Sequence, residues 1–137
     1  ILGEGPLRSN LERYANQLQL SEHLWMPGHV ANPWWFIARA DVFALTSHWE
    51  GFGLVLVEAL VCRVPIVATD CPSGPREILA GEPSSRLTEV ADPTRFAHAI
   101  VEVLKTGRDG SESIRTTERS PWTAATQYRN IMNNVAQ

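Results

Sequence analysis

Apolar residues recur along the chain in two patterns. In some segments they fall three and four residues apart, which places them on one face of a helix. With the start and end signals described below, this spacing predicts helices over residues 6–19, 32–40, 52–62, 74–80 and 92–107. Elsewhere they form short, nearly unbroken runs, which predict strands over residues 24–28, 41–47 and 64–69, preceded by a strand end at residues 1–5.

Several of these helices carry start or end signals. Asn32 and Asp92 are suited to cap the helices that follow, and each precedes a proline, which fits the first helical position. Gly107 is the expected end of the helix that Asp92 begins. Beyond it, residues 108–119 are polar and predict a connection, and a stripe that includes Trp122 and Ile131 predicts a last helix over residues 120–137.

The order of these elements indicates the fold class. Strands alternate with helices of about ten residues, and the strands are almost entirely apolar. Apolar strands of this kind are typical of a parallel sheet that helices cover on both faces. The sequence therefore predicts an α/β domain over residues 1–107, truncated at its start because the chain opens on a strand end with no initiating methionine. We expect the chain to be a piece of a longer protein.

Composition narrows the function classes. The 137 residues are 44% apolar and 20% charged, with a net charge of −3, as in an ordinary globular protein and unlike a nucleic-acid-binding one. The longest apolar run is too short to span a bilayer and is interrupted by Glu58. Two cysteines form no metal cluster or disulfide framework and favour a reducing, cytoplasmic compartment.

The segment HWEGFG, residues 48–53, holds the first candidate site. It follows the strand that ends at Ser47, and ligands of open α/β sheets bind beyond the carboxyl ends of strands. Gly51 and Gly53 remove side chains just before a helix begins, so an anion can approach the free N–H groups closely. A plain strand-to-helix turn explains the spacing equally well.

Glu58 favours a binding site over a plain turn. Its neighbours on the helix are apolar all round, so we expect the helix to be buried and the carboxylate to need hydrogen-bond donors. An arginine in a structural pair is one source of donors, and the vicinal hydroxyls of a ribose are another. Glu50 is either solvated or holds hydroxyls of a second, sugar-like group. Two carboxylates flanking an anion-binding helix start describe a nucleotide-sugar site.

The segment SHWEGFGLVLVEAL, residues 47–60, resembles the paired-glutamate signature of the retaining, GT-B-fold glycosyltransferases of family four (glycosyl transferases group one). The resemblance continues in order through VPIVATDCPSGPREIL, ADPTRFAHAI and SPWTAATQY, and it covers most of the chain. It implies a Rossmann-like sheet with helices on both faces, the C-terminal, donor-binding half of a GT-B enzyme. The enzyme would transfer a hexose to an acceptor hydroxyl with retention at the anomeric carbon.

The resemblance also implies residue roles. Glu50 would be the catalytic carboxylate that contacts hydroxyls of the donor sugar, and Glu58 would bind the ribose. The backbone amides of Gly51, Phe52 and Gly53 would line the sugar and phosphate pocket, and those of Leu54 and Val55 would hold the diphosphate. The loop of Gly28, His29 and Val30 would border the nucleobase.

The implied substrate is a nucleoside-diphosphate sugar, with a UDP-sugar favoured because CPSGPREIL looks like bacterial enzymes of polysaccharide or lipid-linked oligosaccharide assembly. No cofactor, metal or nucleic acid is implied. A pyridoxal-dependent phosphorylase would need a Schiff-base lysine, and Lys105, the only lysine, is far along the chain from the motif. Peripheral contact with the inner face of the membrane and a lipid-linked acceptor stay open, although we expect Trp34 and Trp35 to serve helix packing.

Departures from the family pattern limit what the chain can do. Arg63 stands where the family usually has glycine, which adds strain if the position is left-handed, and the loop near Ser85 lacks a glycine. The family's diphosphate-clamping Arg and Lys, and its N-terminal acceptor-binding domain, would lie upstream of residue 1. We therefore expect the chain alone to be inactive. A non-catalytic nucleotide-binding or scaffold domain is the alternative.

Overall fold

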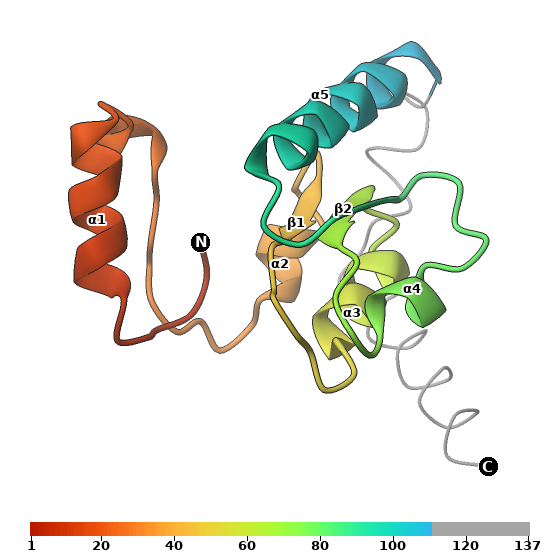
Figure 1. The fold of residues 1–137 in the computed structure, drawn as a ribbon, viewed down its shortest axis with the longest axis horizontal. Coiled ribbons are helices and arrows are strands. Elements are labelled where there is room, and N and C mark those ends of the chain that lie inside the picture. The colour runs from red at the N-terminus through yellow and green to blue at the C-terminus, as the bar shows by residue number, and fades with distance from the viewer. Residues whose placement is uncertain (111–137) are drawn as a thin grey trace. The chain divides into compact units, whose positions relative to one another are not determined.

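The computed structural model describes residues 1–110 (Figure 1). The chain divides after Pro33 into two compact units. No helix of the described residues is both long enough and apolar enough to cross a membrane. The predicted helix over 120–137 and most of the predicted connection over 108–119 fall outside the described range.

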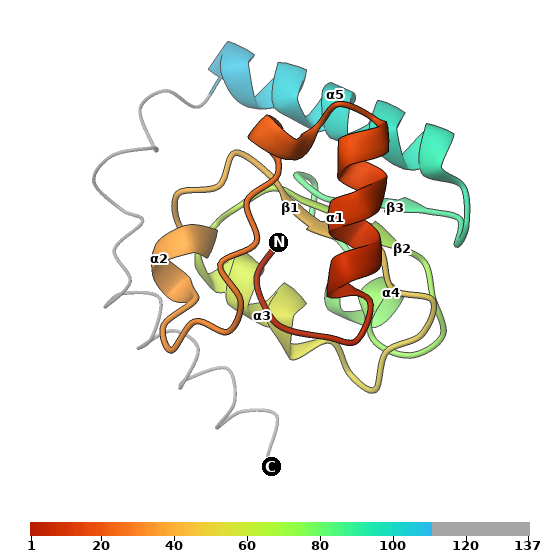
Figure 2. The same ribbon diagram turned by 90° about the vertical axis from the view of Figure 1, so that its left-hand side faces the viewer.

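The first unit is built around helix α1 (Arg8–Gln17), followed by the 3-10 turn η1 (Ser21–His23). Figures 1 and 2 show α1 beside the extended segment that returns from η1. Arg8 links the two, because its Nη2 donates a hydrogen bond to the Met26 carbonyl oxygen at 2.7 Å. The strand predicted over 24–28 is wrong: in its place a single parallel bridge joins Leu2 to Gly28.

The second unit holds a parallel three-stranded sheet in the order β1-β2-β3. Its strands are β1 (Phe43–Leu45), β2 (Ile66–Thr69) and β3 (Arg86–Thr88). The helices that alternate with them are α2 (Trp34–Ile37), α3 (Leu54–Val61), α4 (Pro75–Ile78) and α5 (Pro93–Gly110). The predicted α/β class with a parallel sheet is confirmed.

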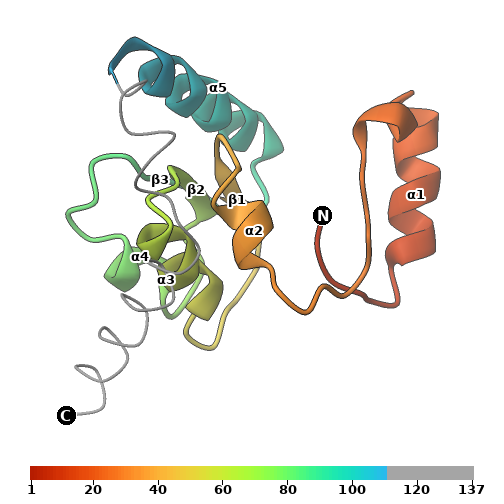
Figure 3. The same ribbon diagram turned by 180° about the vertical axis from the view of Figure 1, so that it is seen from behind.

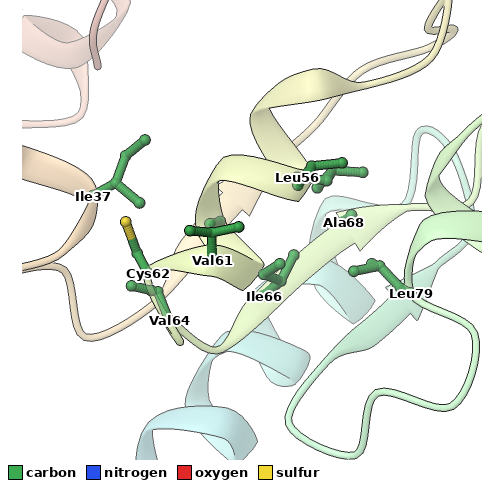
Figure 4. Packing of buried hydrophobic residues seen from close by; sticks show 10 residues of the cluster. Ile37, Leu56, Val61, Cys62, Val64, Ile66, Ala68 and Leu79 are labelled. Atoms are coloured by element: carbon green, nitrogen blue, oxygen red, sulfur yellow. The ribbon is translucent and has the colours of Figure 1, made fainter. Parts of the chain in front are cut away.

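Helices pack on both faces of the sheet, as predicted, and β2 is buried between them. Ile66 and Ala68 face a core formed with α2, α3 and Leu79, whose central side chains are drawn in Figure 4. Val67 points to the other face, where it packs against Phe96, Ala99 and Val103 of α5. Figures 1 and 3 show α5 on one side of the sheet and α3 and α4 on the other. Strict alternation along one fully buried strand therefore builds both cores.

Three elements differ from the sequence-based expectation. Strand β1 is half-exposed instead of buried, because within the described residues it pairs with β2 alone and Ala44 is open to solvent. Strand β3 was not predicted, since its Arg86 and Thr88 are polar and lie between loop residues. Helix α5 continues past Gly107 to Gly110, although its start is as expected: the Arg95 N–H donates to Asp92 Oδ1 at 2.9 Å.

Helix α3 ends in a left-handed residue. Arg63 has φ 54°, its N–H donates to the Leu60 carbonyl oxygen at 2.8 Å, and the N–H of Val64 donates to the Ala59 carbonyl oxygen at 3.1 Å. These two bonds form the Schellman motif, in which glycine is the usual left-handed residue. The strain expected at Arg63 from the sequence is therefore present.

Candidate functional site

The loop between β1 and α3 lies at the carboxyl end of the sheet, where the sequence predicts a ligand. Helix α3 begins at Leu54, directly after Gly53, whose φ of 81° is accessible to glycine and strained for other residues. The Gly53 carbonyl oxygen accepts the first intrahelical bond, from the Leu56 N–H at 2.8 Å. The N–H groups of the first turn, which include those of Leu54 and Val55, are the donors that a helix start offers to an anion.

Glu50 is held at the beginning of this loop. Its Oε1 accepts a hydrogen bond from the Ser47 hydroxyl at 2.5 Å. The bond orients the carboxylate. The residue Glu50 is half-buried, whereas Gly51 and Phe52 after it are exposed. Oriented carboxylates of this kind can accept hydrogen bonds from sugar hydroxyls.

Glu58 lies on the outward face of α3, one turn after Leu54 and Val55, whose side chains are 43% and 39% exposed. The expectation of a helix buried all round is wrong. The buried residues of α3, Leu56, Val57, Ala59 and Val61, pack in the core on the sheet, whereas Leu54 and Val55 are exposed.

The Glu58 carboxylate has no hydrogen-bond or ion-pair partner among the described residues, so the structural pair with an arginine is not formed there. Partial burial among apolar neighbours raises the pKa of Glu58 above its ordinary value of 4.5, because desolvation disfavours the charged form. An acceptor that is desolvated and unpaired is suited to a ligand that supplies hydroxyl donors.

The turn before α4 packs against the loop between β1 and α3, a contact that the sequence did not predict. Gly74 has φ 102° and lies so close to Phe52 that a β-carbon there would overlap the Phe52 carbonyl oxygen. Ile78 of α4 also approaches Gly53, at 3.7 Å from where a β-carbon of that glycine would stand. Gly74-Pro75 was visible in the sequence as a helix start, and nothing in it indicated the partner.

The residues predicted to border the nucleobase belong to the first unit. Gly28 is buried, and its carbonyl oxygen accepts the Gly3 N–H at 2.8 Å. A β-carbon at Gly28 would overlap the Glu4 carboxylate, so the loop is closely packed at this point. His29 is exposed and Val30 half-buried, which leaves both side chains accessible to a ligand.

The carboxyl ends of β1 and β2 also border a cleft of about 380 Å³ on the α5 side of the sheet. His48 and Asp92 are among its polar lining residues, and Phe96 and Ile100 form apolar walls. Within residues 1–110, no group of three or more His, Cys, Asp or Glu side chains is placed to hold a metal ion.

Known proteins resemble this chain in both sequence and fold. The family model described as glycosyl transferases group 1 matches residues 1–119. An N-acetylgalactosaminyltransferase of Campylobacter jejuni, whose name gives a diphospho-undecaprenol-linked acceptor, is 39% identical over 77% of this chain and 29% of its own length. N-acetyl-alpha-D-glucosaminyl L-malate synthase of Bacillus anthracis is 30% identical over 98% of this chain and 37% of its own length.

Solved structures agree on the fold. The lipopolysaccharide outer core galactosyltransferase WaaB superposes with a TM-score of 0.72 at 22% identity, covering 98% of this chain and 39% of that one. TarM gives a TM-score of 0.74 at 22% identity, covering 97% and 28%. The chain thus spans less than two fifths of each of these four proteins, and its fold is part of the GT-B architecture. The chain belongs to the glycosyl transferases group 1 family, the glycosyltransferases that its paired glutamates resemble.

Proposed function

We propose that this chain is the donor-binding part of a retaining glycosyltransferase that moves a hexose from a nucleoside-diphosphate sugar, with UDP favoured, to an acceptor hydroxyl. The observation that carries the proposal is the pair Glu50 and Glu58 on either side of the helix start at Gly53. One carboxylate is oriented by a hydroxyl, the other is desolvated and unpaired, and the free amides of α3 lie between them in sequence.

Each group has a role in this proposal. Glu50 accepts hydroxyls of the donor sugar and is the residue closest to the chemistry. The backbone of Gly51, Phe52 and Gly53 lines the sugar and phosphate pocket, and the amides of Leu54 and Val55 hold the diphosphate. Glu58 binds the ribose hydroxyls, and Gly28, His29 and Val30 border the base.

In this proposal, the chain contributes to catalysis by stabilising the diphosphate leaving group. As the glycosidic bond to the diphosphate breaks, negative charge grows on the phosphate oxygens, and preorganised N–H donors stabilise it. The positive end of the α3 dipole acts in the same direction. The hydroxyl contacts of Glu50 fix the sugar so that the acceptor attacks one face of it.

The names of relatives support a UDP-sugar and a saccharide acceptor. The Anabaena protein HepE was solved with UDP and glucose, and the pneumococcal transferase GtfA with UDP and GlcNAc. Relatives act on a diphospho-undecaprenol-linked sugar and on the lipopolysaccharide core. We place the complete enzyme in polysaccharide or lipid-linked oligosaccharide assembly in bacteria, in the cytoplasm or peripherally at the inner face of the membrane. Its N-terminal domain would bind the acceptor, so the chain alone is inactive.

Titration of the ¹⁵N-labelled chain with UDP, GDP and ADP tests the proposal. We expect UDP to shift the amides of residues 53–58 with a dissociation constant on the order of 1 mM, about 4 kcal/mol, since the proposed phosphate contacts are backbone amides and include no cationic side chain. Glu58→Ala should abolish the shifts. Glu102→Ala is the matched control, because Glu102 is also a helical glutamate but lies exposed on α5.

Two results would count against the proposal. A folded spectrum that no nucleotide shifts contradicts donor binding by this chain, and shifts that survive Glu58→Ala contradict the ribose role. A non-catalytic nucleotide-binding domain is the alternative function. It is supported if a complete enzyme containing this chain binds UDP but neither hydrolyses nor transfers any UDP-sugar.

A further inference from the structure

Thr69, the last residue of β2, is hydrogen-bonded to the segment that follows the neighbouring strand β1. It is one of the few buried polar residues of the described chain, at 5% exposure. Its Oγ1 donates a hydrogen bond to the Ser47 carbonyl oxygen at 2.5 Å and lies 3.4 Å from the Leu45 carbonyl oxygen. The pairing of β1 with β2 ends at Leu45 and Ala68. The hydrogen bond from Thr69 to Ser47 therefore connects the two segments two residues beyond Leu45.

The residue that Thr69 holds is the one that contacts Glu50. An ionised carboxylate can only accept, so the Ser47 hydroxyl is the donor in its 2.5 Å bond to Glu50 Oε1. A hydrogen bond to a charged acceptor is stronger than one between neutral groups. It occupies one oxygen of Glu50 and restrains the orientation of the carboxylate, which leaves the second oxygen for another donor.

We infer that Ser47 and Thr69 are positioning residues, which aim the Glu50 carboxylate at the sugar hydroxyls of the donor. This inference deepens the proposed function and rests on it. Thr69 fixes the backbone of Ser47 from β2, Ser47 fixes Glu50, and of these three side chains only that of Glu50 touches the sugar. The nucleotide is held elsewhere, by Glu58 and the start of α3, so loss of this link weakens recognition of the sugar and spares recognition of UDP.

The alternative is that the Ser47–Glu50 bond merely closes a four-residue turn. A purely structural bond of this kind would affect the stability of the loop, and UDP and UDP-sugar binding would fall together. The comparison of the two ligands separates these cases, because UDP lacks the sugar that Glu50 would contact.

The first experiment measures both affinities by NMR for the whole chain and for Ser47→Ala, using the tightest binder among UDP-glucose, UDP-galactose and UDP-N-acetylglucosamine. We expect Ser47→Ala to weaken UDP-sugar binding about tenfold, a typical effect of one hydrogen bond to a charged group, and to change UDP binding less than twofold. Ser47→Thr keeps the hydroxyl and should restore the affinity. Equal loss for both ligands, or no loss for either, overturns the inference.

Thr69 is tested by Thr69→Val, which keeps the shape and removes the donor, with Thr69→Ser as the conservative variant. Thr69→Val should reproduce the selective loss, and Thr69→Ser should not. Because folding is a concern at a buried site, each variant is first checked for a native ¹⁵N spectrum. If Thr69→Val does not fold, Thr69→Ala replaces it.

A ligand-free measurement keeps the inference separate from the proposed function. Three-bond couplings to the Glu50 Cγ report whether χ1 occupies a single rotamer. We expect one rotamer in the unmodified chain and averaged couplings in Ser47→Ala. If no nucleotide binds but the couplings behave in this way, the proposed function fails while the positioning of Glu50 stands. Averaged couplings in the unmodified chain overturn the positioning itself.

Discussion

Gly74 packs directly against the carbonyl oxygen of Phe52, and it joins the turn before α4 to the loop that precedes α3. The carbonyl carbon of Phe52 would lie 2.8 Å from a β-carbon at Gly74, which is closer than real β-carbons approach. The φ of 102° at Gly74 is itself strained for any other residue. The conformation of the loop that precedes α3 therefore depends on a glycine 22 residues further along the chain than Phe52.

Gly74→Ala should destabilise the chain and displace the loop. We expect a loss of about 2 to 4 kcal/mol in the free energy of unfolding, since overpacking and backbone strain add. Urea unfolding measures it, and the control is Gly81→Ala. Gly81 has a similar φ of 78°, but a β-carbon there would meet nothing within 4 Å. Equal losses in the two variants would show that the contact with Phe52 contributes nothing.

The sequence predicted the outline of this site because its signals are local. Gly53 directly precedes the helix that it permits, and Glu58 stands out as the one charge in an apolar segment. The contacts of Gly74 with Phe52 and of Thr69 with Ser47 join residues 22 positions apart. No spacing rule relates such pairs, because their proximity follows from the sheet pairing and from how the loops fold.

The misjudged elements have a related cause. Apolar character marked β2, which is buried on both faces, but it could not reveal β3, whose register with β2 is fixed through backbone bonds. The same apolar character led to an overestimate of the burial of β1 and of α3. An apolar sequence shows that a segment can be buried, but it does not show whether another part of the chain covers it.

Arg63→Gly should be more stable than Arg63→Ala, because both variants lose the side-chain contacts of Arg63 and only Arg63→Ala keeps the left-handed strain. The left-handed φ of 54° is unfavourable for arginine by about 1 kcal/mol relative to glycine, while the Schellman bonds at the end of α3 stay in place. Urea unfolding should show a difference of about 0.5 kcal/mol between the two variants, with the entropy of the unfolded glycine offsetting part of the relief. Equal stability of Arg63→Gly and Arg63→Ala would contradict the backbone explanation.

Asp92→Ala should loosen the start of α5. Asp92 Oδ1 accepts the Arg95 N–H, and the loss of such a cap typically costs about 1 kcal/mol. Asp92→Asn keeps the acceptor and removes the charge that pairs with Arg95 Nε at 3.3 Å, so it should lie close to the unmodified chain. Thermal unfolding of the three proteins distinguishes the cap from the ion pair, because only the ion pair is lost in both variants.

The raised pKa of Glu58 makes stability depend on pH in the direction opposite to that of a salt-bridged carboxylate. Because the folded chain holds this proton above pH 4.5, where the unfolded chain releases it, stability falls as pH rises from 4.5 through the folded pKa. Glu58→Gln removes the effect, so its stability relative to the unmodified chain should increase across that window and then level off. A ¹³C titration of the Glu58 carboxyl should have its midpoint above 4.5, and a midpoint at or below 4.5 would contradict the desolvation of this side chain. Under the ribose role that we propose for Glu58, bound UDP should lower that midpoint, since hydroxyl donors stabilise the ionised form.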